Sequence, residues 1–67
     1  MNYAKKIIYQ SNYWYNDGLK KAKVRDMSGA IISLKRSLQY NRENIAARNL
    51  LGLVYYGIGE VSEALVE

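Results

Sequence analysis

The stretch NLLGLVYYGIGEVSEAL, residues 49–65, holds three of the chain's five glycines inside a pattern that otherwise predicts helix. Glycine in a helix interior costs about 1 kcal/mol relative to alanine, so Gly52 requires a reason. A second stretch, WYNDGLKKAKVRDMSGAI at residues 14–31, has Gly18 in the matching place, 34 residues earlier. A period of this length indicates an internal helical repeat.

The length limits the chain to one small domain, and the composition excludes crosslinking by disulfides. The chain has 67 residues and contains no proline, cysteine or histidine. Disulfides are excluded, and so are the thiolate and imidazole ligands of most structural zinc sites, so we expect no metal and no cofactor. No apolar run approaches the ~18 residues of a membrane span, and residues 1–10 lack a signal-peptide core. We therefore expect a soluble, cytoplasmic protein without membrane contact.

The net charge of +4 permits an acidic partner but does not require one. Basic residues gather in KKAKVR, residues 20–25, and at Lys35 and Arg36. A solvated helix face explains such a run, and contact with phosphates is the alternative. Binding of nucleic acid is the weaker interpretation, because the tyrosines lie on predicted packing faces and the lysines point away from them.

Apolar residues recur with the period of a helix in two places. The two stripes consist of Met27, Ala30, Ile31, Leu34 and Leu38, and of Ala47, Leu50, Leu51, Val54, Tyr55 and Ile58. Asp26 and Asn44 suit the N-caps of these two helices, and Asn41 can end the first of them.

The predicted fold is all-α, with helices over about residues 3–23, 27–40, 45–58 and 61–67 and no strand. These helices form antiparallel helix–turn–helix pairs, and Gly59 is expected to end the third helix because a left-handed residue reverses the chain. The first helix either runs unbroken from Tyr3 or begins after a cap in QSN, residues 10–12.

The two units are aligned by Gly18 with Gly52 and by Ala30 with Ala64, each pair 34 residues apart, and eight residues in all match a repeat pattern. These are Trp14, Gly18, Ala30 and Leu34 in residues 11–44, and Leu51, Gly52, Tyr55 and Ala64 in residues 45–67. In this register the chain resembles the tetratricopeptide repeat (TPR) family, with Leu34 standing for the family's Phe. It departs from the family's pattern at Asp17, Lys21, Arg42 and Arg48, so the repeats are divergent.

The resemblance implies a single domain, residues 1–67, built as a short right-handed superhelix. Residues 1–10 are then an N-terminal helical extension, residues 11–44 the first repeat, and residues 45–67 a truncated second repeat. We expect the eight register residues to pack the helices together. Gly18 and Gly52 would lie where two helices approach so closely that a side chain would hold the backbones apart.

Catalytic groups are scarce, so we expect a binding protein and no enzyme. The six carboxylates are scattered over helix starts and turns, and helix capping explains Asp26 and Glu60 better than acid–base chemistry does. No small-molecule substrate is expected.

By resemblance, the first helix of each unit lines a concave groove that holds a peptide or helix of a partner protein. The residues expected in this groove are Asn12, Tyr15, Leu19, Lys23, Asn49, Leu53 and Tyr56. The alternative is that Tyr15, Leu19 and Tyr56 belong to the core or contact a second copy. A truncated repeat also leaves apolar surface at its end, so a homo-oligomer joined through exposed repeat ends is expected.

Overall fold

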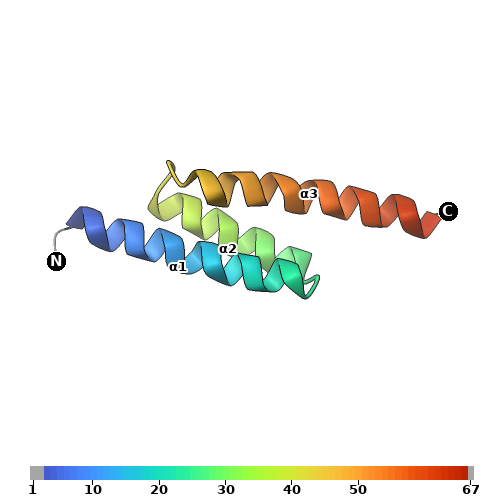
Figure 1. Ribbon diagram of the computed structural model, residues 1–67, viewed down its shortest axis with the longest axis horizontal. Coiled ribbons are helices and arrows are strands. Elements are labelled where there is room, and N and C mark those ends of the chain that lie inside the picture. Colours follow the sequence, from blue (N-terminus) through green and yellow to red (C-terminus); the bar gives the residue numbers. More distant parts are fainter. Residues whose placement is uncertain (1–2, 67) are drawn as a thin grey trace.

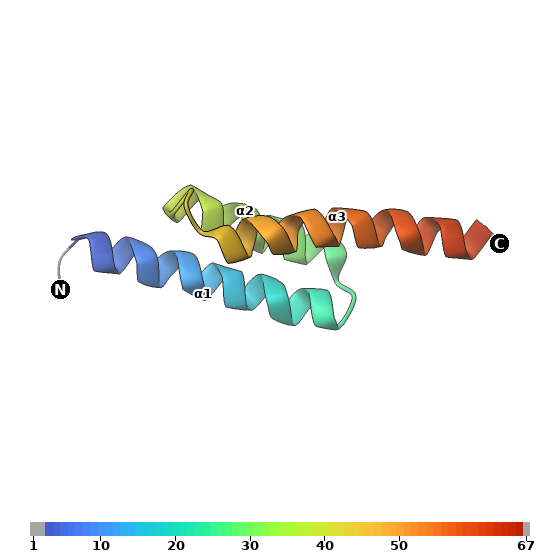
Figure 2. The same ribbon diagram turned by 45° about the horizontal axis from the view of Figure 1, so that its top comes forward.

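The computed structural model describes the backbone of residues 3–66 and the side chains of residues 3–57. This part of the chain consists of three helices, α1 (Tyr3–Lys23), α2 (Met27–Tyr40) and α3 (Ile45–Val66), without a strand. Helices α1 and α2 form an antiparallel hairpin, and α3 lies along α2 in the opposite direction (Figure 1). The turned view in Figure 2 shows that α3 continues beyond the hairpin, which helps to make the molecule elongated, at 52 × 18 × 13 Å.

The all-α class and the bounds of the first two helices agree with the sequence prediction. Helix α1 passes through residues 10–12 without a cap, so the first of the two alternatives is confirmed. The prediction for the third helix is wrong at its end. Helix α3 continues through Gly57 and Gly59, and no glycine in the described backbone has a positive φ. The hydrogen bonds on both sides of a glycine offset its low helix propensity, so no separate helix begins at residue 61.

A left-handed residue closes the turn between α1 and α2. Arg25 has a φ of 65°. The Asp26 N–H donates to the Lys21 carbonyl at 2.9 Å, and the Arg25 N–H donates to the Ala22 carbonyl at 3.0 Å. This is the Schellman pattern, in which glycine usually occupies the left-handed position. Asp26 then caps α2 as predicted, because its Oδ1 accepts a hydrogen bond from the Gly29 N–H at 3.0 Å.

Small residues line the contact between α1 and α2. Ser11 and Gly18 are buried on α1, and Ala30, Ser33 and Ser37 are buried on α2. Short side chains let two helix backbones approach closely, so this interface is held by contact between backbones and by short polar groups. Leu34 is the largest fully buried side chain of the described residues and lies against Gly18.

Gly18 lies in the close contact that the sequence predicted. A Cβ atom at this position would lie 2.7 Å from Leu34 Cγ, 2.9 Å from Leu34 Cδ2 and 3.3 Å from the Ala30 carbonyl oxygen. The same prediction is wrong for Gly52, which is exposed and has nothing within 4 Å of an added Cβ. The helix expected to pack against Gly52 is instead the continuation of α3. Ala64, its expected counterpart, lies outside the residues whose side chains are described.

Helix α3 packs on the hairpin with one face. Ala47 and Val54 are buried in the core beside Ala30 and Leu34. Several half-buried side chains surround this cluster: Tyr15, Ala22, Met27, Ile31, Leu38, Leu50 and Leu51. Tyr55, expected to pack between repeats, remains 48% exposed. Burial on one face alone leaves the rest of α3 in contact with solvent.

Alanine at the two repeat-related glycines should change stability in opposite directions. Gly18→Ala forces a methyl group against the immobile Leu34 and should destabilise the fold by about 1 to 2 kcal/mol. Gly52→Ala meets open space and should stabilise it by up to about 1 kcal/mol through helix propensity. Urea unfolding followed by circular dichroism measures both. Equal effects of the two substitutions would contradict the close contact at Gly18.

Candidate partner-binding surface

The predicted groove residues of α1 divide into exposed and half-buried positions. Asn12 and Lys23 are exposed, whereas Tyr15 and Leu19 are half-buried. Tyr15 packs against the core cluster, as the alternative interpretation of this residue proposed. On α1 the polar ends of the predicted groove are therefore open to solvent, and its apolar middle is partly used for packing.

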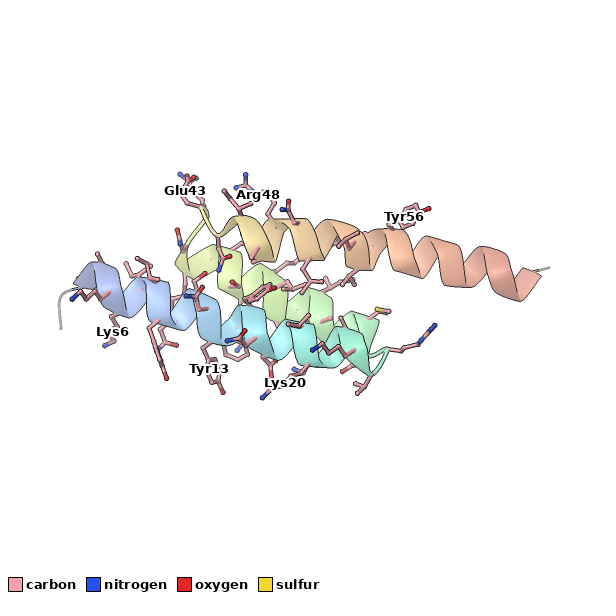
Figure 3. All side chains as sticks on the ribbon, viewed as in Figure 1. Lys6, Tyr13, Lys20, Glu43, Arg48 and Tyr56 are labelled. Carbon is pink, nitrogen blue, oxygen red and sulfur yellow. The ribbon has the colours of Figure 1, made fainter. Side chains whose placement is uncertain are left out.

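The predicted groove residues of α3 are all exposed. Leu53 and Tyr56 are 64% and 65% exposed, and Asn49 is exposed as well. Figure 3 shows Tyr56 pointing away from the hairpin. Ile45, four residues before Asn49 and therefore on the same side of the helix, is 68% exposed. We name Ile45, Asn49, Leu53 and Tyr56 the outer face of α3.

Asn44 positions α3, and with it this outer face. Its Oδ1 accepts a hydrogen bond from the Ala47 N–H at 3.0 Å, which is the predicted N-cap. Its amide nitrogen donates to Ser11 Oγ at 2.8 Å and to Ser37 Oγ at 3.3 Å. A third contact joins the same nitrogen to Asn12 Oδ1 at 3.3 Å. One buried side chain therefore connects the first turn of α3 to both helices of the hairpin.

The two serines beneath Asn44 form a reciprocal pair. Ser11 Oγ donates to the Ser37 carbonyl at 2.8 Å, and Ser37 Oγ donates to the Ser11 carbonyl at 2.7 Å. Each hydroxyl then accepts from the Asn44 amide with its lone pairs. No buried side-chain nitrogen or oxygen in the described residues lacks a hydrogen-bond partner. A satisfied polar network of this kind holds one arrangement of the three helices.

A second polar contact joins the two helices of the hairpin nearer the turn between them. Asp17 Oδ2 accepts a hydrogen bond from Ser33 Oγ at 2.5 Å and pairs with Lys21 Nζ at 2.8 Å. Lys21 Nζ also donates to Ser33 Oγ at 3.3 Å. The Lys21 ammonium and, after it, the Ser33 hydroxyl lower the pKa of the Asp17 carboxyl below its usual 3.8. Asp17 and Lys21 are two of the departures from the repeat pattern, and Ser33 is the partner that accommodates both.

Trp14, expected to pack between the helices, lies half-buried at the edge of the hairpin. The Arg36 guanidinium carbon is 4.8 Å from the centre of its ring, a cation–π contact. Tyr13 meets the same ring edge to face, with centroids 5.3 Å apart. Arg36, one of the basic residues considered for phosphate contact, is thus engaged with an aromatic ring.

The sequence prediction did not include Ser11, Ser33 or Ser37. The available signal was their spacing, since Ala30, Ser33 and Ser37 share one side of α2 and Ser11 lies seven residues before Gly18 on α1. Small polar residues in line with a glycine indicate a close, hydrogen-bonded helix contact.

Residues 3–57 contain no group of three or more potential metal-ligating side chains, and no described helix is long and apolar enough to cross a bilayer.

A comparison with known proteins finds one short similarity to report. A stretch of 42 residues, 63% of this chain, is 45% identical to the BBSome complex member bbs-4 of Caenorhabditis elegans. The chain spans only 9% of the length of that relative. No protein-family model matches the chain, and no solved structure matches it significantly. The similarity therefore concerns a short helical stretch of a much longer protein.

Removing the Asn44 side chain should loosen α3 from the hairpin. Asn44→Ala loses the N-cap and leaves two buried serine oxygens without their donor, which should cost about 2 to 3 kcal/mol of stability. Asn41→Ala is the control, because Asn41 Oδ1 accepts only from the exposed Glu43 N–H at 3.1 Å. Chemical unfolding of both variants measures the difference. Similar losses for Asn41→Ala and Asn44→Ala would contradict the role of Asn44.

The Asp17 contacts should make the free energy of unfolding depend on pH. Because folding lowers the pKa of this carboxyl, its contribution is fully present above about pH 4 and is lost as the pH falls through the folded value. Asp17→Asn should therefore melt at a lower temperature than the wild type at neutral pH and approach it at acid pH. Glu43→Gln, a change in the exposed turn, should follow the wild type at both pH values. A constant difference between Asp17→Asn and wild type across the pH range would contradict this assignment.

Proposed function

We propose that this chain is a protein-interaction scaffold that binds a partner polypeptide along α3 and performs no catalysis. The observation that carries the proposal is the exposed outer face of α3, on a helix whose opposite face is anchored in the core. Ile45, Leu53 and Tyr56 each leave more than half of their surface in solvent. Large exposed apolar side chains along one face of an anchored helix are typical of a surface that a partner covers.

The residue types of the outer face suit a polypeptide. Tyr56 offers a large contact area with few rotatable bonds, and tyrosine is enriched among the residues that dominate binding energy. Leu53 supplies an apolar contact beside it. The Asn49 amide supplies both a donor and an acceptor for the partner's backbone. An apolar centre with a polar neighbour is the usual composition of a protein interface.

In the finer form of the proposal, the partner also contacts α1. Asn12 and Lys23 would be the exposed polar contacts there, and the exposed parts of Tyr15 and Leu19 the apolar ones. The Asn44 network supports this arrangement because it holds the end of α2, the start of α3 and the middle of α1 in one position. A preorganised surface loses less entropy on binding.

The similarity to a protein named as a member of the BBSome complex supports a role in protein assembly. Proteins of that kind act by contact with other chains, which agrees with a fold built of packed helices and an uncovered outer face. The partners of that relative are not assigned to this chain, since the chain spans 9% of its length.

A crosslinking side chain tests which surface meets the partner. A benzophenone amino acid in place of Tyr56 should link the chain to one defined protein on irradiation in cells. The same replacement at Tyr13 should not, although Tyr13 is also exposed, at 55%, because it points away from α3 (Figure 3). With that protein purified, Tyr56→Ala should weaken binding by about 1 to 2 kcal/mol and Tyr13→Ala should leave it unchanged.

Other outcomes of this experiment would contradict the proposal. Equal crosslinking from both positions would show that exposed tyrosines are not selective. A product with twice the mass of the chain would favour the second candidate function, self-association through the same apolar face of α3. If the chain instead forms a complex with nucleic acid, and the affinity falls steeply with added salt, the partner is a phosphate backbone and not a polypeptide.

A further inference from the structure

A hollow of about 550 Å³ lies beside the junction of α2 and α3. Five residues line it: Lys35, Leu38 and Gln39 of α2, Arg42 of the turn, and Arg48 of α3. None of them belongs to the predicted groove or to the outer face of α3. We name this hollow the basic pocket.

The charge of the basic pocket is not neutralised within the described side chains. Lys35, Arg42 and Arg48 contribute three positive charges, and none of them forms an ion pair in residues 3–57. Glu43 points to the same side of the molecule as Arg48 (Figure 3), but it pairs with none of the three. Helix α3 also has no acidic residue in its first turn, so the positive end of its dipole adds to the excess.

Arg48 is held in position before any ligand arrives. Its Nη2 donates a hydrogen bond to the Arg42 carbonyl at 2.6 Å. The turn that carries this carbonyl is itself fixed, because the Asn44 N–H donates to the Asn41 carbonyl at 3.1 Å and the Asn44 side chain is buried. An anchored guanidinium loses less entropy on binding and keeps other N–H groups for a carboxylate.

The floor of the pocket is apolar. Leu38 is half-buried and packs against the core cluster, so its remaining surface opens into the pocket between the cations. A carboxylate alone would leave this surface in water. A ligand that places an apolar side chain beside two acidic groups would cover Leu38 and pair with the cations at the rim.

We propose that the basic pocket docks an acidic amphipathic helix of a partner polypeptide. Glutamates one helical turn apart, at i and i+4, lie about 6 Å from each other and can reach cations on both α2 and α3. A leucine or similar residue at i+3, beside them on the same face, would enter the pocket over Leu38. The pairing of Arg48 with one carboxylate would use two parallel N–H···O bonds.

A nucleic-acid backbone fits this surface less well than an acidic helix. A backbone presents phosphates at regular intervals and requires a continuous track of cations. The cations of this chain are dispersed, since Lys6 and Lys20 point away from the side that carries Arg48 (Figure 3). Arg36 is engaged with Trp14. Lys35, Arg42 and Arg48 form a compact group of three cations around Leu38, which matches a few carboxylates with an apolar residue beside them.

The experiment uses a fluorescent peptide of about 15 residues with glutamate and leucine at helical spacing. Its counterpart carries glutamine for each glutamate. Fluorescence anisotropy with the whole chain should show binding of the glutamate peptide and little binding of the glutamine peptide. Lys35→Gln and Arg48→Gln should each weaken binding of the glutamate peptide by about tenfold, the usual loss for one charge-assisted contact.

Lys20→Gln is the matched control for charge. It also removes one exposed lysine, but from the opposite side of the molecule (Figure 3), so it should change affinity by less than about twofold. The Lys35 side chain is exposed and forms no hydrogen bond or ion pair among the described residues, so Lys35→Gln should leave the fold intact. It therefore decides the result even where Arg48→Gln disturbs the turn.

Three results would overturn the proposal. Equal weakening by Lys35→Gln and Lys20→Gln would show that only net charge attracts the peptide. If the glutamine peptide bound as tightly as the glutamate peptide, the carboxylates would contribute nothing and the contact would be apolar only. Tighter binding of a single-stranded oligonucleotide of the same charge would assign the cations to nucleic acid. None of these results depends on Tyr56, so they test the basic pocket separately from the outer face of α3.

Discussion

The buried side chain of Asn44 is the constraint on which the arrangement of the three helices depends. Its side-chain oxygen caps the first turn of α3, and its side-chain amide nitrogen donates to serines of both α1 and α2. A polar group in this place is stable only when all of its hydrogen bonds are made, and a small shift of any helix would break one of them. Asn44 therefore fixes where α3 starts relative to the hairpin, and the packing of Ala47 and Val54 sets the direction of the rest of the helix.

Close contact between α1 and α2 makes that network possible. Gly18 leaves room for Leu34, and the serine hydroxyls can reach across to carbonyls on the facing helix only because the backbones approach so closely. The same geometry explains the divergence from the repeat pattern. Asp17 and Lys21, where the chain departs from that pattern, are accommodated because Ser33 on α2 provides a hydrogen-bonding partner for both.

The two binding surfaces arise because α3 is anchored on one side only. Its buried face is used by Ala47 and Val54, and its outer face presents Leu53 and Tyr56 to solvent. At its start, Arg48 is turned toward the loop and completes a pocket with cations of α2 and the turn. An apolar surface and a basic pocket on one short helix can bind different parts of a partner polypeptide.

The sequence by itself determined the first two helices, the start of α3 and the caps before α2 and α3. The period of the apolar residues, Asp26 before α2 and Asn44 before α3 act over three or four residues, so their effect does not depend on the rest of the fold. The role of a residue on a helix face, in contrast, depends on the rest of the fold. Gly18 and Gly52 are equivalent in the sequence, but only Gly18 lies opposite another helix, and α3 continues where a turn was predicted. Which surface lies across from a side chain is decided by tertiary packing, because distant segments supply that surface and no local pattern encodes it.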